Sequence, residues 1–195
     1  GGQVLPIEVE RMAGRGQWVV TGRLGDVMRE SAQVAMTLAR ARTDSRPFHR
    51  WDWHLHVPEG AVPKDGPSAG AALLVAVVSR LLGKAPTDGV AYTGEITLGG
   101  RVLAVGGIRE KVLAADRAGL RTVVLPRENA DELDELPVST RERMTLVPVA
   151  KVDDVLRIAG LDTTAADTFL TALPIEAPIE GSIEAPGETM PPGTA

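Results

Sequence analysis

The sequence of 195 residues contains no cysteine, which excludes disulfide bonds and thiolate chemistry. The lack of cysteine fits a reducing compartment, and we expect a cytoplasmic protein. A long apolar run is also missing, because the uncharged stretch at 66–79 is too short to span a bilayer. The chain begins with Gly-Gly and shows no signal-peptide pattern, which favours a fragment or a processed product of a longer chain.

The sequence has no excess of positive charge. Its formal net charge is −5, and residues 162–195 contain six carboxylates and neither Lys nor Arg. Residues 1–161 therefore carry a net charge of only +1. A body so close to neutral does not favour nucleic acid or an anionic membrane surface as a partner.

The composition changes at about residue 162, where a segment rich in proline and glutamate begins. Proline at this density excludes helix and central strand, and the segment has little apolar surface to bury. We therefore predict one domain over residues 1–161 and a flexible acidic tail over 162–195.

Strand and helix patterns are mixed along the domain. Alternating apolar residues and turn residues predict strands at 4–12, 16–21, 51–57, 122–125 and 145–149, and a hairpin of 91–97 with 101–105. Apolar spacings of three and four predict helices at 24–42, 67–82, 108–118 and 152–159. Early strands followed by strand–helix units predict a single α+β domain with a mixed sheet and argue against a doubly wound sheet.

The run PKDGPSAG at 63–70 places Ser68 after a glycine-proline bend, where the helix 67–82 is expected to begin. Backbone N–H groups at a helix start are unpaired and can bind a developing oxyanion. A serine in this position either starts the helix or acts as a nucleophile, and the local pattern leaves both interpretations open.

A nucleophilic serine needs a base to take its proton. His54 and His56 lie two apart on a predicted strand and so share one face, which fits a base beside its neighbour or two metal ligands. No third ligand has a convincing spacing, so we predict no metal site. No Ser is followed by Lys three positions later, which excludes the β-lactamase pattern.

Lys111 is the other candidate base. It is the only charged residue on the apolar face of the helix 108–118. Such a lysine either extends from the helix edge into solvent or is buried, and burial and the helix dipole would both lower its pKa. An ordinary lysine, with a pKa of about 10.4, is neutral only about once in 2,500 molecules at pH 7, so a base needs that shift.

Two long stretches, PKDGPSAG at 63–70 and TGEITLGGRVLAVGGIREKVLAADRAG at 93–119, resemble the proteolytic domain of Lon, the ATP-dependent bacterial and organellar protease. Shorter stretches agree: TGRLGDVMRESAQVA at 21–35, HLHVPEGA at 54–61 and TVVLPREN at 122–129. The resemblance covers about residues 4–160 in order and does not extend to the tail. It implies the Lon proteolytic-domain fold, which is shared with a small-subunit ribosomal protein domain and the GHMP kinases.

The resemblance also implies a Ser-Lys dyad, with Ser68 as nucleophile and Lys111 as general base. It implies that Thr93 contacts and orients the lysine amine. Positions that surround the family site, and to which supporting roles are assigned on the resemblance, are Asp65, Glu8, His54 and His56.

By resemblance, the expected activity is that of a serine endopeptidase that hydrolyses unfolded or misfolded proteins, in a hexameric ring and without a cofactor in this chain. ATP and Mg²⁺ serve the ATPase portion of the full-length family, and this sequence contains no G-x-x-x-x-G-K-[ST] loop. One alternative is a catalytically silent Lon-like interaction domain, which would be expected to lose the serine or the lysine. A phosphate-transferring enzyme would need a glycine-rich phosphate loop, for which GPSAG is too short.

Overall fold

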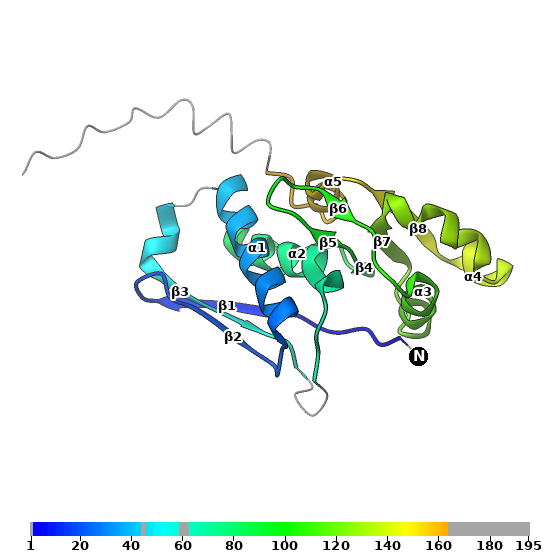
Figure 1. Cartoon of the computed structure of the whole chain (residues 1–195). Coiled ribbons are helices and arrows are strands. Elements are labelled where there is room, and N and C mark those ends of the chain that lie inside the picture. Colours follow the sequence, from blue (N-terminus) through cyan, green and yellow to red (C-terminus); the bar gives the residue numbers. More distant parts are fainter. Residues whose placement is uncertain (1, 44–45, 59–62, 164–195) are drawn as a thin grey trace, which may run out of the picture.

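The computed structural model describes residues 2–43, 46–58 and 63–163. Its helices are α1 (Asp26–Arg42), α2 (Gly70–Leu82), α3 (Ile108–Arg117), α4 (Val138–Arg143) and α5 (Val152–Ile158), with 3₁₀ turns η1 (Arg46–Arg50), η2 (Pro67–Ala69) and η3 (Arg127–Glu135). Its strands are β1 (Glu8–Ala13), β2 (Trp18–Thr21), β3 (Trp51–His56), β4 (Val90–Tyr92), β5 (Glu95–Ile96), β6 (Val102–Leu103), β7 (Thr122–Pro126) and β8 (Thr145–Val149). Figure 1 shows these helices and strands packed into one body. The predicted single α+β domain is therefore confirmed.

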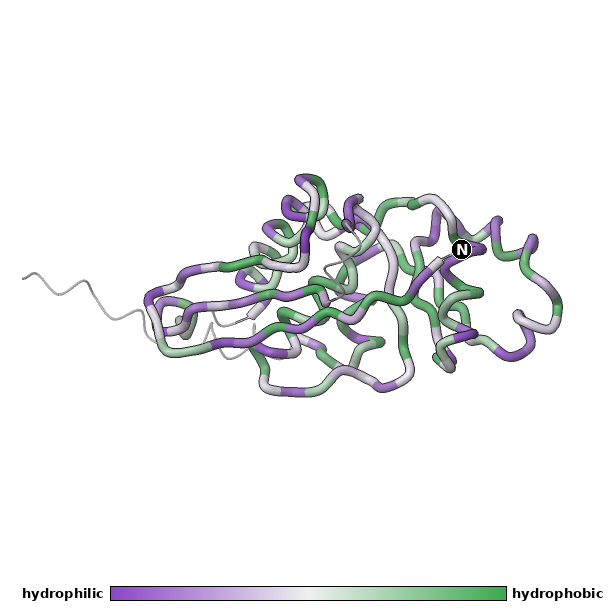
Figure 2. Tube along the Cα trace, turned by 90° about the horizontal axis from the view of Figure 1, so that it is seen from below, coloured by the Kyte–Doolittle hydropathy of each residue, from purple (hydrophilic) through white to green (hydrophobic). Residues whose placement is uncertain are grey.

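The first sheet has the order β1-β3-β2. Strands β1 and β2 follow each other in the sequence but do not pair, because β3 lies between them, antiparallel to β1 and parallel to β2. Figure 2 shows hydrophilic and hydrophobic residues alternating along these strands. Trp53 and Leu55 on β3 are buried in the core, while His54 and His56 point to the other face. The predicted strand 4–12 is shorter than expected, since residues 2–7 are extended without pairing.

The predicted strand 91–97 is divided in two at Gly94. β4 joins the parallel sheet β4-β7-β8, whereas β5 forms a short hairpin with β6. Gly94 has φ +152°, and a Cβ built there would lie 2.6 Å from Cγ1 of Val102. The chain therefore changes sheets at a position that only glycine can occupy without displacement.

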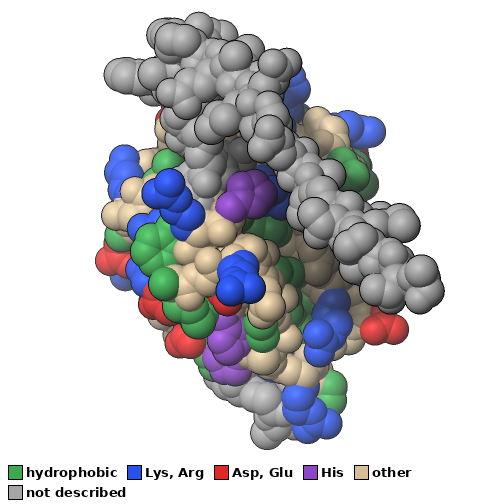
Figure 3. Space-filling model, turned by 90° about the vertical axis from the view of Figure 1, so that its left-hand side faces the viewer, with side chains coloured by type: hydrophobic (Ala, Val, Ile, Leu, Met, Phe, Trp, Pro, Cys, Tyr) green, Lys and Arg blue, Asp and Glu red, His purple; other side chains and the backbone are tan. Residues whose placement is uncertain are grey.

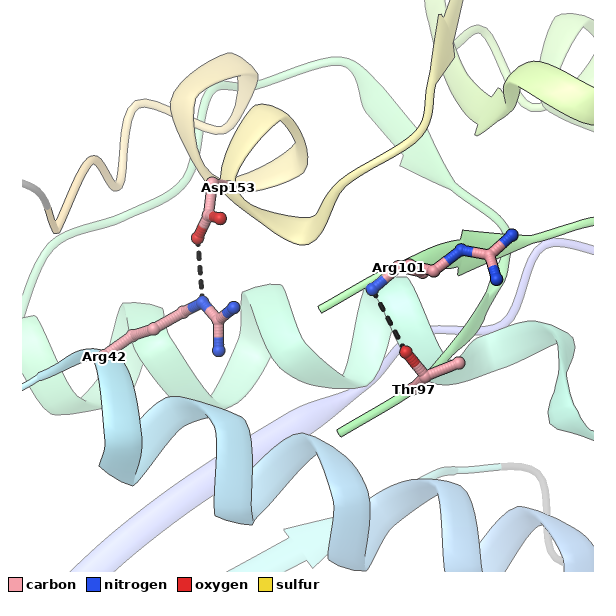
Figure 4. Close-up of polar contacts among 4 residues, drawn as sticks. All are labelled: Arg42, Thr97, Arg101 and Asp153. Carbon is pink, nitrogen blue, oxygen red and sulfur yellow. Dashed lines mark hydrogen bonds and ion pairs between the residues drawn. The ribbon is translucent and has the colours of Figure 1, made fainter. Parts of the chain in front are cut away.

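Figure 4 shows two polar contacts, one inside the β5–β6 hairpin turn and one between two helices beside it. The backbone N–H of Arg101 donates to Oγ1 of Thr97 at 3.1 Å and closes the turn. Beside it, Arg42 at the end of α1 pairs with Asp153 at the start of α5, with 2.8 Å between Nε and Oδ1. The Arg42–Asp153 pair thus connects α1 to the C-terminal helix α5.

Helix α2 is the centre of the core, as its apolar sequence predicts. Its fully buried residues include Leu73, Leu74, Val77 and Val78, and each such side chain stabilises the fold by about 1.5–3 kcal/mol. The helix was predicted from residue 67, but the α-helical part begins at Gly70, after the 3₁₀ turn η2. Ser68 lies in the middle of that turn.

Candidate active site

The segment before Ser68 is fixed on the N-terminus of α1. The carboxylate of Asp65 accepts hydrogen bonds from the backbone N–H groups of Met28, at 3.0 Å, and of Gly66, at 2.8 Å. The backbone N–H of Gly25 also donates to the carbonyl of Lys64 at 2.8 Å. A Cβ built on Gly25 would overlap the Asp65 carboxylate. Asp65 thus caps a helix far from it in sequence, where the helix dipole favours negative charge.

The turn that carries Ser68 is attached to the segment after β4. The carbonyl oxygen of Ser68 accepts the backbone N–H of Gly94 at 2.8 Å and the hydroxyl of Thr93 at 3.2 Å. Residues 66–70 also spell the nucleophile-elbow string G-x-S-x-G, but a loop and not a strand precedes the turn here. Thr93 therefore fixes the backbone of Ser68. The resemblance implies that its hydroxyl contacts the lysine amine, but here the hydroxyl bonds the Ser68 carbonyl instead.

Lys111 lies in the first turn of α3 and is partly buried. Burial lowers the pKa of its amine, and the carboxylates of Glu110 and Glu132 partly oppose that shift by raising it. The amine donates a hydrogen bond to the carbonyl of Gly106 at 2.6 Å. Within the described part of the chain no hydrogen bond joins this amine to the hydroxyl of Ser68.

Ser68, Thr93 and Lys111 line one pocket of about 660 Å³. Its walls come from one face of α2, from β4, from α3 and from the N-terminal segment at 3–7. In Figure 1 this segment begins beside α3 and runs toward β1. Most of the lining is apolar, so a group inside is shielded from water on several sides. Tyr92 also lines the pocket, and burial raises the pKa of its hydroxyl to about 12, so it stays neutral.

The other predicted site residues lie outside the lining of this pocket. His54 and His56 both bond the hydroxyl of Thr21, at 2.8 Å through Nε2 and 2.7 Å through Nδ1. Glu8 is the register partner of His56. Among the described residues, no group of three His, Cys, Asp or Glu side chains is arranged to hold a metal ion.

Three residues that contact the lysine amine, shift its pKa or hold such a group were not identified from the sequence. They are Gly106, whose carbonyl receives the amine, and Asn129 and Glu132 on η3. The stretch TVVLPREN at 122–129, which resembles the family, includes Asn129. A single polar residue after a strand has no distinctive pattern, so the sequence did not mark it as a site residue.

Among the described residues, no helix is both long enough and apolar enough to cross a membrane. The chain is 51% identical over 164 residues to the Lon protease of Chloroflexus aggregans, which covers 82% of this chain and 20% of that protein. It is 49% identical to Lon protease 1 of Bacillus subtilis, over 82% of this chain and 21% of that protein. The Lon protease of Heliobacterium modesticaldum is 46% identical over 98% of this chain and 22% of its own length.

This chain thus spans about a fifth of the length of the curated relatives it matches. The family model of the Lon protease C-terminal proteolytic domain matches residues 1–161. The predicted tail at 162–195 lies beyond that match, and nearly all of it lies outside the described residues. The chain belongs to the family of Lon protease C-terminal proteolytic domains.

Proposed function

We propose that this chain is a serine endopeptidase in which Ser68 is the nucleophile and Lys111 the general base. The observation that carries the proposal is the shared pocket, which brings together a serine at a helix start and a lysine whose pKa is lowered by burial. A neutral amine is needed to accept a proton near pH 7, and burial is the effect that makes it available.

In the proposed reaction the amine of Lys111 leaves the carbonyl of Gly106 and turns to the hydroxyl of Ser68. It takes the hydroxyl proton as Oγ attacks the carbonyl carbon of a peptide bond. Backbone N–H groups of the turn before α2 are the donors that we expect to bind the oxyanion. The ammonium then gives its proton to the leaving amine, and water activated by the same lysine hydrolyses the acyl-enzyme.

The proposed substrates are unfolded or misfolded proteins, which can enter the pocket as extended chains. On the face drawn in Figure 3, Lys and Arg side chains are separated by uncharged and acidic ones, so its described part offers no continuous basic track for nucleic acid. We further propose that the domain works in the cytoplasm within a hexameric ring of a longer protein and needs no cofactor of its own.

The test is cleavage of a fluorogenic peptide between pH 6 and 10 by the wild type, Ser68→Ala and Lys111→Ala. Activity without nucleotide or metal, lost in both variants while their circular dichroism is unchanged, would support the dyad. His56→Ala is the matched control, because it removes a titratable side chain outside the pocket. Loss of activity in His56→Ala with retention in Lys111→Ala would make histidine the base. A folded wild type that cleaves no peptide would favour an interaction domain.

A further inference from the structure

One buried side chain holds the loop that leads into α3. Asn129, only 4% exposed, forms two hydrogen bonds with the backbone of Val105. Its Oδ1 accepts the backbone N–H at 3.0 Å, and its Nδ2 donates to the carbonyl at 2.9 Å. The side-chain amide thus pairs with both backbone groups of Val105, as a neighbouring strand would. The two bonds fix the position and the direction of the backbone at Val105.

The next residue of that loop, Gly106, supplies the carbonyl that accepts the Lys111 amine at 2.6 Å. A Cβ built on Gly106 would meet no atom within 4 Å, so packing around its Cα does not hold this point of the loop. The position of the carbonyl consequently depends on the bonds of its two neighbours. Asn129 holds Val105 on one side, and on the other the carbonyl of Gly107 accepts the backbone N–H of Lys111 at 3.1 Å.

Asn129 also places a charge. Its Nδ2 donates to Oε1 of Glu132 at 2.6 Å, which fixes this carboxylate on the side of η3 that affects Lys111. The carbonyl of Gly106 and the carboxylate of Glu132 both favour the protonated amine. A general base needs such support at the moment when it has taken the proton.

We propose that Asn129 is a positioning residue for Lys111: it holds the Gly106 carbonyl and the Glu132 carboxylate in place for the protonated amine. The inference rests on the proposed function, because it assigns these groups to the base of that reaction. Asn129 does not line the pocket and acts only through the groups that it holds.

Among the described residues, the charges that shift the pKa of this amine are two carboxylates. Glu110 comes from its own helix and Glu132 from η3. The N-terminal segment, the turn before α2 and β4 contribute uncharged residues to the pocket, namely Gln3, Ser68 and Thr93, and the neutral Tyr92. The cations that line the pocket, Arg80 and Lys84, lie near the far end of α2. That end is about 18 Å from Ser68 along the helix axis.

We call the three hydrogen bonds of the Asn129 side chain, two to Val105 and one to Glu132, the clamp. The test compares Asn129→Leu, which removes every bond of the clamp, with Glu132→Gln, which keeps an acceptor for Nδ2 and removes the charge. Asn129→Leu should lower kcat at least about tenfold with KM changed less than about twofold, because binding is retained while the base is misplaced. Glu132→Gln should move the rising limb of the pH profile down by about one unit. Thr140→Val, which also alters a buried polar residue, and Glu135→Gln, which also neutralises a carboxylate of η3, are the matched controls.

A second readout measures the amine directly. In the Ser68→Ala background, the rate at which an amine-reactive reagent labels Lys111 is followed against pH by mass spectrometry. The titration midpoint should fall in both Asn129→Leu and Glu132→Gln and stay unchanged in both controls. This midpoint is obtained without catalysis, so it reports on the clamp even if Lys111→Ala proves active and the proposed dyad is wrong.

The proposal is overturned if folded Asn129→Leu keeps the wild-type kcat and Lys111 midpoint. It is equally overturned if Asn129→Leu loses no more activity than Thr140→Val at matched thermal stability. Should Asn129→Leu fail to fold, Glu132→Gln decides, and an unchanged midpoint there removes the role given to the clamp.

Discussion

Burial and negative charge act on the Lys111 amine in opposite directions, and burial has the larger effect on its pKa. The lowered pKa means that the folded state binds this proton less well than the unfolded chain. Lys111 therefore makes stability rise with pH between the lowered pKa and about 10.4. At neutral pH the protonated amine opposes folding, so the residue that makes the base useful also costs stability.

Lys111→Met should accordingly abolish peptide cleavage and unfold at pH 7 at the same temperature as the wild type or up to a few degrees higher. The difference should narrow as the pH approaches 10, because the wild-type amine then loses its proton. Thermal unfolding at both pH values measures this. Lys84→Met, which alters an exposed lysine at the pocket edge, is the control. A melting temperature of Lys111→Met well below the wild type at pH 7 would contradict the argument.

Gly25 and Asp65 form a contact that can be broken from either side. Asp65→Ala removes the cap of α1 and should lower the free energy of unfolding by about 1 kcal/mol. Because this carboxylate also anchors the turn of Ser68, kcat of the Asp65→Ala protein should fall as well. Gly25→Ala should have a similar effect, since the added Cβ would displace the carboxylate. Urea unfolding and peptide kinetics measure both effects.

The control for Gly25→Ala is Gly99→Ala, because a Cβ there meets only Oγ1 of Thr97, at 3.8 Å. A Gly25→Ala protein with wild-type stability and kcat would mean that the carboxylate is not held as described.

The sequence predicts the elements well and their partners poorly. Alternating apolar residues identify the strands 16–21 and 51–57, but alternation carries no information about which strand pairs with which, so the insertion of β3 between β1 and β2 could not be foreseen. The same pattern runs through Gly94 as though one strand continued. Ser68 is noticed because it follows a glycine-proline bend at a helix start, and Lys111 because it is the charged residue on an apolar helix face. The resemblance assigns their roles, whereas Asn129 has no such signal.

Gly94 joins two elements to the site, which makes it the sharpest test at the level of elements. Its backbone N–H donates to Ser68 and its carbonyl accepts the N–H of Ala71 at 3.1 Å. Gly94→Ala should cost about 1–3 kcal/mol of stability, because alanine rarely adopts φ +152° and its Cβ would press on Val102. Peptide cleavage should fall more than stability alone explains. Urea unfolding checks the first effect, and kcat measured well below the unfolding transition checks the second; a stable, fully active variant would contradict both.

At the level of the whole molecule, the pocket is assembled from parts that are distant in sequence. The N-terminal segment reaches α3, where the carbonyl of Gly2 accepts Nη2 of Arg117 at 3.2 Å. A Cβ built on Gly2 would lie 2.6 Å from the carbonyl oxygen of Glu110, so the segment touches the backbone of the helix that carries Lys111. The site is therefore completed only when the N-terminal segment is folded against α3.

The proposed chemistry and the domain's size lead to a last expectation. The sequence contains no phosphate-binding loop of the G-x-x-x-x-G-K-[ST] type, and we expect the pocket of about 660 Å³ to take a substrate chain only in extended form. ATP with Mg²⁺ should leave the rate of peptide cleavage by this chain unchanged within error. A stably folded protein substrate should resist cleavage, while the same substrate, kept unfolded by a destabilising substitution, should be degraded. Gel electrophoresis of both substrates, with and without nucleotide, measures this. Acceleration by ATP would mean that nucleotide acts on the proteolytic domain itself, and degradation of the folded substrate would mean that the pocket opens much further than this structure shows.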